Sequence, residues 1–190
     1  MTKILAFAGS ARGDSTNKKL VAAAAAAART AGAEVTLIDL RDFPMPLYDG
    51  DLEASQGLPE HTKRLKSLML SHDGLLVSCP EYNSSITPLL KNTIDWASRP
   101  APGEASLACF DGKIAALLSA SPGALGGLRG LVHVRAILGN IGVLVLPAQI
   151  AVGKAHEAFG LDGRMRDAKQ QASVEKLVAQ LVAAVTKLKA

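Results

Sequence analysis

The chain contains little cysteine, few aromatic residues and no long apolar stretch. Its two cysteines, Cys79 and Cys109, form neither a CxxC pair nor a cluster with metal-ligand spacing, so we expect no metal and a reducing compartment. No segment approaches the roughly 18 consecutive apolar residues that cross a bilayer. The apolar run at residues 4–8 is too short for the core of a secretory leader. We therefore expect a cytoplasmic protein without a membrane partner.

Charged residues are neither abundant nor clustered. The chain has 21 basic and 17 acidic residues, a formal net charge of +4, without the blocks of about five or six like charges that mark interaction tails. Nucleic-acid binding proteins show clustered basic residues, so we expect no nucleic-acid partner. With 48% hydrophobic and only 4% aromatic residues, the 190 residues suit one domain, 1–190, with a core of alanine, valine, leucine and isoleucine.

The apolar residues gather in short runs. Each run is nearly continuous rather than alternating, which is typical of parallel strands covered on both faces of a sheet. Glycine or polar residues follow each run, and then comes a segment whose apolar residues have helical spacing. The predicted strands span residues 4–8, 35–40, 74–78, 114–119 and 142–146.

The predicted helices begin at recognisable caps. Ser15 can cap the first, and Thr87 with Pro88 can begin the third. Five alternations of strand and helix predict a three-layer α/β sandwich with right-handed crossovers. Such sheets bind ligands beyond the carboxyl ends of their strands, so the candidate site lies in the loops there. The helices are expected at residues 16–31, from about 59, from 88 to before Pro100, at 127–138 and from about 167.

The loop after the first predicted strand has residues suited to a phosphate. It reads Gly-Ser-Ala-Arg-Gly-Asp-Ser-Thr-Asn over residues 9–17. Backbone N–H groups at a helix N-terminus attract anions, and Arg12 can add a bidentate contact. Neither a Walker A nor a GxGxxG motif is present. The alternatives are an ordinary capped helix start and, on Asp39 alone, an NAD-binding protein without flavin.

The loop after the third predicted strand, residues 79–88, is rich in hydrogen-bonding groups and ends at a capped helix. A flat heterocycle needs donors and acceptors around its edge and an apolar or aromatic surface on its face. Tyr82 is a candidate for the face, with an exposed loop tyrosine as the alternative. Glu81 has no second carboxylate at a suitable spacing and receives no acid–base role, and Cys79 is interpreted as an inert thiol.

The loop after the fourth predicted strand, residues 119–129, combines hydroxyls and glycines just before a helix. This composition allows the backbone to approach a ligand closely, and a flexible helix start has the same composition. All three loops follow parallel strands, so we expect them at one edge of the sheet. Their shared position favours a common ligand.

At these residues the chain resembles the NADPH-dependent FMN reductase family, which includes chromate, quinone and azo-dye reductases of flavodoxin-like fold. The resemblance spans most of the chain in the right order. It implies a flavodoxin-like five-stranded parallel sheet of order 2-1-3-4-5 with helices on both faces. The matching segments are residues 9–12 with Ser15 and Asn17, residues 80–83, residues 90–92 with 94–96, and residues 119–127.

The resemblance also implies an FMN site. The first loop holds the FMN phosphate, the second holds the ribityl chain and the isoalloxazine ring, and the third flanks the ring. The family commonly has a glycine where this chain has Ser84, which leaves the backbone angle there open. The implied FMN-binding residues are Ser10, Arg12, Ser15, Thr16, Asn17, Pro80, Glu81, Tyr82, Asn83, Ser84, Ser85, Ser119, Ser121 and Gly123.

By the same resemblance the protein passes hydride from NADPH or NADH through bound FMN to a small oxidant in a ping-pong cycle. The oxidant is a quinone, an azo compound, a flavin or a metal oxyanion such as chromate, and the cofactor carries the chemistry. The alternative is a flavodoxin that carries electrons with FMN and does not oxidise NAD(P)H. Outside the candidate loops lie all four histidines, His61, His72, His133 and His156.

Family members usually form dimers or tetramers in which a neighbouring subunit helps to close the flavin site, so we expect a homodimer or homotetramer. The apolar segment 43–48, which ends at Tyr48, is either such a contact or a rigid loop on its own subunit. The sequence decides neither this nor the choice between NADPH and NADH.

Overall fold

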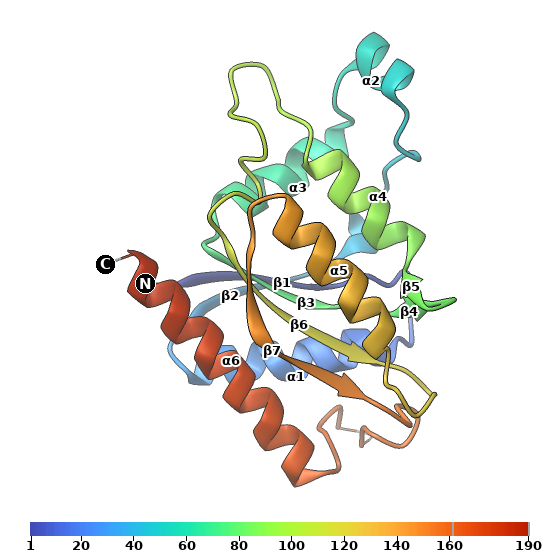
Figure 1. The fold of residues 1–190 in the computed structure, drawn as a ribbon, viewed down its shortest axis with the longest axis vertical. Coiled ribbons are helices and arrows are strands. Elements are labelled where there is room, and N and C mark those ends of the chain that lie inside the picture. The colour runs from blue at the N-terminus through green and yellow to red at the C-terminus, as the bar shows by residue number, and fades with distance from the viewer. Residues whose placement is uncertain (161, 190) are drawn as a thin grey trace.

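The computed structural model describes residues 1–160 and 162–189 and has a parallel sheet between two layers of helices (Figure 1). The sheet order is β2-β1-β3-β6-β7. The predicted order 2-1-3-4-5 is confirmed, with β6 and β7 as its fourth and fifth strands. The strands are β1 (Lys3–Ala8), β2 (Glu34–Asp39), β3 (Gly74–Ser78), β6 (Ile114–Ala120) and β7 (Leu144–Val152).

Each face of the sheet has its own core. Along β1, Ile4 and Ala6 point into one core, while Leu5 and Phe7 point into the other, because successive residues of a strand face opposite sides. The first core is covered by two helices and the second by three. These are α1 (Thr16–Thr30) and α6 (Ala168–Lys189) on the first face, and α3 (Glu60–Leu70), α4 (Pro88–Ala97) and α5 (Leu128–Asn140) on the second.

The alanine run of α1 brings this helix close to the sheet. Ala24, Ala25 and Ala28 are buried in the core, whereas Ala22 and Ala26 are exposed. Alanine has the highest helix propensity and adds little bulk, so the helix forms readily and packs against several strands at once. Its contacts with β1, β3 and β6 place its first turn beside the carboxyl ends of these strands.

The predicted bounds differ most at β7. The sequence predicts residues 142–146, whereas the strand continues to Val152 and contains Pro147. Its register against β6 is irregular, since Val145 pairs with Ala115 and the next pair is Gln149 with Leu117. Proline is tolerated on edge strands and at such irregularities because it has no N–H to donate. The strand therefore continues past Pro147, a residue type that usually ends a strand.

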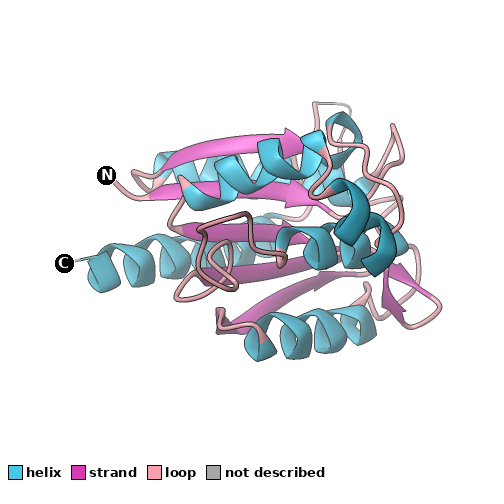
Figure 2. Cartoon of the chain, turned by 90° about the horizontal axis from the view of Figure 1, so that it is seen from above, coloured by secondary structure: helices cyan, strands magenta, loops and turns pink. Residues whose placement is uncertain are grey.

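Short elements between the main ones were not predicted. They include the 3₁₀ helix η1 (Leu40–Asp42), the helix α2 (Gly50–Gln56), and a hairpin of β4 (Glu81–Tyr82) and β5 (Ser85–Ile86). The hairpin lies inside the second predicted loop. It projects from the edge of the sheet toward which the strand arrows point in Figure 2, on the side opposite both termini.

The segment 43–48 packs on its own subunit. The N–H of Tyr48 donates to Asn92 Oδ1 (2.8 Å), and the Trp96 indole donates to the carbonyl oxygen of Pro46 (2.8 Å). The rings of Tyr48 and Trp96 meet edge to face with centroids 5.1 Å apart. The segment is therefore held against α4. Among the described helices, none combines the length and apolar character that a membrane crossing requires.

Candidate active site

Hydrogen bonds join the three predicted loops at the carboxyl edge of the sheet. The N–H of Gly9 donates to the carbonyl oxygen of Ser78 (2.9 Å), and Thr87 Oγ1 donates to the carbonyl oxygen of Gly9 (2.7 Å). Ser119 Oγ donates to the carbonyl oxygen of Cys79 (2.7 Å). The first loop is thus bound to the second, and the second to the third.

The first loop leads into α1, whose N-terminus is open. Ser15 caps this helix: its Oγ accepts from the N–H of Lys18 (3.4 Å), and its carbonyl oxygen accepts from the N–H of Lys19 (3.1 Å). The first N–H groups of a helix have no partner within the helix. Those of Thr16 and Asn17 therefore lack a helical partner, at the end where the helix dipole attracts an anion.

Arg12 precedes this N-terminus in the first loop. Its side chain is exposed, and among residues 1–160 and 162–189 it forms no ion pair. The neighbouring Asp14 pairs instead with Lys19 (2.5 Å), whose hydrogen bond lowers the pKa of the Asp14 carboxyl. Ser10 is buried and its Oγ accepts from the N–H of Arg12 (3.3 Å), which shapes the turn. The guanidinium is therefore available to an anion.

The second loop is a tight hairpin. β4 and β5 pair in antiparallel register and leave Asn83 and Ser84 as a two-residue turn. Both residues have positive φ, 49° and 67°, as a two-residue hairpin turn of this hand requires. Ser84 thus keeps the left-handed angle that glycine adopts most easily. Beside the turn, Tyr82 is 47% exposed, and before it Pro80 is buried.

Glu81 ties the hairpin to the start of α5. Its carboxylate accepts from the N–H of Gly130 (3.1 Å) and from Nε and Nη2 of Arg129 (3.0 and 2.7 Å). The Glu81 side chain is nearly buried, whereas that of Arg129 is exposed. Burial raises the pKa of Glu81, but these donors outweigh it and hold the pKa below its ordinary value. An ionised carboxylate has no proton to donate at neutral pH.

The third loop is buried where it leaves β6 and accessible at its tip. Ser119 is fully buried, and a methyl group added to Gly127 would overlap its hydroxyl, so α5 starts in direct contact with the end of β6. Ser121 is half-buried and Gly123 is exposed, and the N–H of Gly123 donates to Ser121 Oγ (3.4 Å). Ser119 therefore supports the loop from beneath, while the other two residues are open to a ligand.

Cys79 and Asp39, both discussed from the sequence, are held within the protein. Burial raises the pKa of the Cys79 thiol, which agrees with an inert cysteine. Asp39, the one support for an NAD-binding protein without flavin, pairs with Lys18 Nζ (2.6 Å) and accepts from the N–H of Arg41 (3.0 Å). Its carboxylate caps η1 and anchors α1.

A cavity of about 460 Å³ lies beside the hairpin, between α4 and α5. Two of its lining residues contact each other, with His133 Nδ1 and Ser85 Oγ 2.9 Å apart. His133 belongs to a helix and not to a predicted loop, so no local pattern indicates this contact. The cavity is lined by Ser85, Ile86, Thr87, Pro88, Lys91, His133, Ala136 and Ile137.

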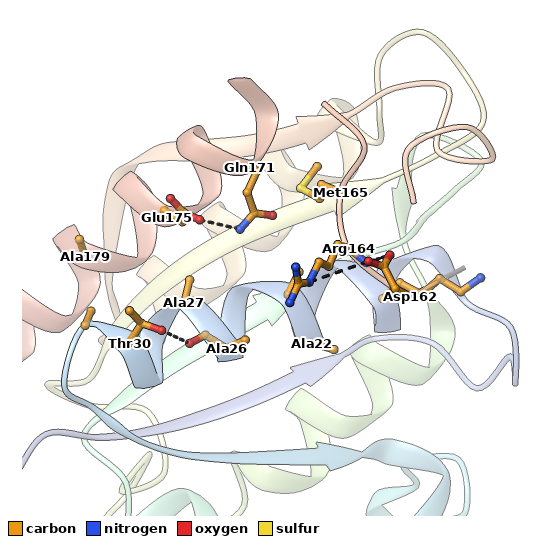
Figure 3. A pocket seen from close by; sticks show the side chains of 14 residues that line it. Ala22, Ala26, Ala27, Thr30, Asp162, Arg164, Met165, Gln171, Glu175 and Ala179 are labelled. Carbon is orange, nitrogen blue, oxygen red and sulfur yellow. Dashed lines mark hydrogen bonds and ion pairs between the residues drawn. The ribbon is translucent and has the colours of Figure 1, made fainter. Parts of the chain in front are cut away.

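A groove of about 800 Å³ between α1 and α6 is separate from this site (Figure 3). Alanines of α1, Ala26 among them, form one wall. Gln171 donates to Glu175 (2.8 Å) on α6, and Arg164 lies 3.9 Å from Asp162 in the preceding loop. None of the predicted site residues lines this groove, so its volume has no bearing on the three loops.

The sequence model of one protein family matches the part of the chain that contains the sheet and all three loops. The model of the NADPH-dependent FMN reductases matches residues 2–157. The chain belongs to the NADPH-dependent FMN reductase family. It is therefore an oxidoreductase that uses FMN and takes NAD(P)H as its co-substrate, which confirms the prediction from the sequence.

Individual relatives agree with this family. An NAD(P)H-dependent FMN reductase of Pseudomonas aeruginosa is 34% identical over 188 residues, which cover 98% of this chain and 97% of the relative. A quinone reductase of Pseudomonas putida is 34% identical over 163 residues, 84% and 82% of the two chains. The solved structure of an NAD(P)H:acceptor flavoenzyme from Paracoccus denitrificans shares 29% identity over 98% of both chains, with a TM-score of 0.83. A flavodoxin from an archaeon shares the fold alone, with 10% identity and a TM-score of 0.63.

Proposed function

We propose that the protein reduces quinones with NAD(P)H by means of FMN bound at the carboxyl edge of the sheet. The observation that carries this proposal is the N-terminus of α1, where Ser15 caps the helix just after the loop that contains the exposed Arg12. A phosphate suits these groups because charge-assisted hydrogen bonds are the strong ones. Quinones are the favoured acceptors because quinone reductases are among the relatives with 34% identity.

The residues of the three loops fit the parts of FMN. The first loop offers N–H groups, hydroxyls and one positive charge for the phosphate. The hairpin offers backbone groups and the exposed Tyr82 for the ring, and the tip of the third loop offers a hydroxyl and an exposed backbone on its other side. The assignment is Ser10, Arg12, Ser15 and Thr16 to the phosphate, Pro80, Tyr82, Asn83, Ser84 and Ser85 to the ribityl chain and ring, and Ser121 and Gly123 to the ring, with Glu81 and Ser119 supporting them.

Bound FMN supplies the acceptance of a hydride from NAD(P)H and its delivery to the acceptor. The hairpin and the third loop would hold and orient the ring. Glu81 holds the hairpin against α5, so the two walls of the ring site stay at a constant distance. Tyr82 and Arg129 are both exposed, and we expect NAD(P)H and the quinone to reach the ring beside them in turn. This alternation gives ping-pong kinetics.

A homodimer or homotetramer goes with this function. Leu47, at the outer side of the segment held on α4, is 79% exposed, and Val132 on α5 is 58% exposed. A second copy that covers either side chain is the partner that the family implies. Light scattering of the purified protein measures the mass; a monomer at micromolar concentration would contradict this part. The two free thiols support a cytoplasmic location.

The test combines a spectrum with a choice of acceptors. Purified protein is given FMN, freed of excess, and mixed with NADPH without oxygen. We expect retained flavin absorbance that bleaches with NADPH and returns when a benzoquinone is added. Flavin that stays oxidised favours an electron carrier, and absence of retained flavin overturns the FMN site.

Steady-state kcat/KM at fixed NADPH then compares a benzoquinone with an azo dye, free FMN and chromate. A quinone that is the best of the four supports the acceptor assignment. A larger kcat/KM for chromate or for the azo dye overturns it and leaves the flavin chemistry in place.

A further inference from the structure

The side chain of Asn17 is buried at the carboxyl edge of the sheet. Only 4% of the residue is exposed. Its Nδ2 donates to the carbonyl oxygen of Ala120 (2.7 Å), and its Oδ1 accepts from the N–H of Ala120 (3.0 Å) and from Ser78 Oγ (2.8 Å). One side-chain amide thereby connects the first turn of α1 to the ends of β3 and β6.

This amide continues the hydrogen bonding of the sheet where a strand has ended. The ladder between β3 and β6 stops at the pair of Ser78 and Leu118, two residues before Ala120. On its other side Ala120 pairs with Val152 of β7. Ala120 is only 3% exposed, and buried backbone groups are almost always paired because an unpaired one is costly. Asn17 therefore supplies the partner that the missing strand would have supplied, at the base of the third loop.

The same bonds separate Asn17 from the phosphate ligands proposed above. Its Oδ1 accepts two hydrogen bonds, and an oxygen acceptor has nothing to offer a phosphate oxygen. One of the two N–H groups of its Nδ2 donates to Ala120, and the residue is only 4% exposed, which leaves a ligand little access to the other. The Arg12 guanidinium, by contrast, is exposed and unpaired within the described chain. The contribution of Asn17 to a bound anion is its backbone N–H.

We infer that the Asn17 side chain is a positioning residue, which fixes the phosphate loop relative to the third loop and so governs affinity for the whole flavin. The inference rests on the proposed FMN site. In this inference the amide holds two loops in place relative to each other, whereas the resemblance to the family implied that Asn17 contacts the phosphate.

Riboflavin distinguishes the two roles because it has the ring and ribityl chain of FMN and lacks the phosphate. A residue that binds the phosphate contributes to FMN binding alone. A residue that places the two loops contributes to both flavins. The ratio of the dissociation constants for riboflavin and FMN therefore reports phosphate contacts, and their common change reports positioning.

The experiment measures both dissociation constants by quenching of flavin fluorescence at one pH and salt concentration. The proteins are the wild type, Asn17→Ala, Ser78→Ala and Arg12→Ala, each freed of flavin and shown to be folded by circular dichroism. We expect Asn17→Ala to weaken both flavins by about tenfold or more with their ratio unchanged. Ser78→Ala, which removes one of the three bonds, weakens both by a smaller factor. Arg12→Ala weakens FMN alone.

Two results would overturn the inference. Weaker FMN binding by Asn17→Ala with riboflavin binding unchanged makes Asn17 a phosphate ligand. Unchanged affinity for both flavins in a folded variant would show that the Asn17 amide contributes to the stability of the protein and not to flavin binding. If Asn17→Ala does not fold, the dissociation constants of Ser78→Ala for FMN and riboflavin test the inference in the same way. A wild-type protein that binds neither flavin is a different result, since it refutes the FMN site itself.

Discussion

The two ends of the candidate flavin site are built in opposite ways. At the phosphate end, the N–H groups of Thr16 and Asn17 have no partner among residues 1–160 and 162–189, and Arg12 is exposed. At the ring end, polar groups are bound to one another: Glu81 holds Arg129 and the N–H of Gly130. A bound anion would complete the hydrogen bonding at the first end, whereas the protein completes its own at the second.

From this difference we expect the phosphate end to determine how tightly FMN binds and the ring end to determine how the ring is oriented. A donor without an internal partner exchanges water for the anion, and a hydrogen bond to a charged group contributes about 1.5–3 kcal/mol net. A wall whose polar groups are already paired needs no rearrangement when a flat ring enters, and such preorganisation lowers the cost of binding. Changes at the phosphate end should therefore alter how tightly FMN is held, and changes at the ring end should alter turnover.

The largest effect is expected from removing the charge at the phosphate end. Arg12→Ala should weaken FMN binding about 10- to 100-fold, because a hydrogen bond to a charged group contributes about 1.5–3 kcal/mol. Fluorescence titration measures it, with Arg29→Ala at the far end of α1 as the matched control. FMN affinity equal to that of the control would contradict the role of the first loop.

A smaller effect is expected at the ring end. Glu81→Gln keeps the shape of the side chain and an acceptor for Gly130, but it no longer balances the charge of Arg129. We expect kcat/KM for the quinone to fall about three- to tenfold, with the ratio of riboflavin to FMN dissociation constants unchanged. Glu157→Gln, at an exposed glutamate outside the hairpin, is the control. A loss confined to FMN affinity would show that both ends work in the same way.

The ion pair at the ring end also gives stability a dependence on pH. The pKa of Glu81 is lowered in the folded protein, so its contribution is complete above the unfolded-state pKa of about 4.3 and is lost as the pH falls through the folded-state pKa. The difference in free energy of unfolding between wild type and Glu81→Gln should therefore shrink below about pH 4. Urea unfolding at several pH values measures it; a difference that stays constant from neutral to acid pH would exclude a contribution from the ionised carboxylate.

The hairpin turn offers a stabilising change. Ser84→Gly should raise the free energy of unfolding by about 0.5–1 kcal/mol, because a left-handed conformation costs a residue with a side chain about 1–2 kcal/mol and the flexibility of glycine offsets part of the gain. Urea unfolding is the measurement. Ser85→Gly, in the strand that follows, should destabilise, and equal effects of the two changes would argue against the turn geometry.

The smallest effect is expected outside both ends. Asp39→Asn breaks a partly exposed ion pair with Lys18, and such pairs contribute about 0–1 kcal/mol. Stability should change little and the KM for NADPH should stay the same in steady-state assays. A clear rise in that KM would give Asp39 a part in binding the dinucleotide.

Local patterns were enough to predict the sheet and its helices. Continuous apolar runs indicate strands buried on both faces, and Thr87 followed by Pro88 marks the start of α4. Pro147 made β7 appear too short, because proline ends most strands and only the irregular pairing with β6 accommodates it here. The hairpin was missed since each of its strands has two residues, too few for any periodicity.

By itself the sequence determined the strands and helix caps and indicated three loops for the candidate site, because glycines, hydroxyls and a helix cap have local consequences that neighbouring residues change little. Tertiary structure alone decided what each side chain in those loops binds. Asn17 meets Ala120 across 103 residues of chain, and Glu81 meets Arg129 across 48. Periodicity is a property of single elements, so it holds no information about such pairs. Whether a polar side chain faces the ligand or the protein depends on which backbone groups the sheet leaves unpaired beside it.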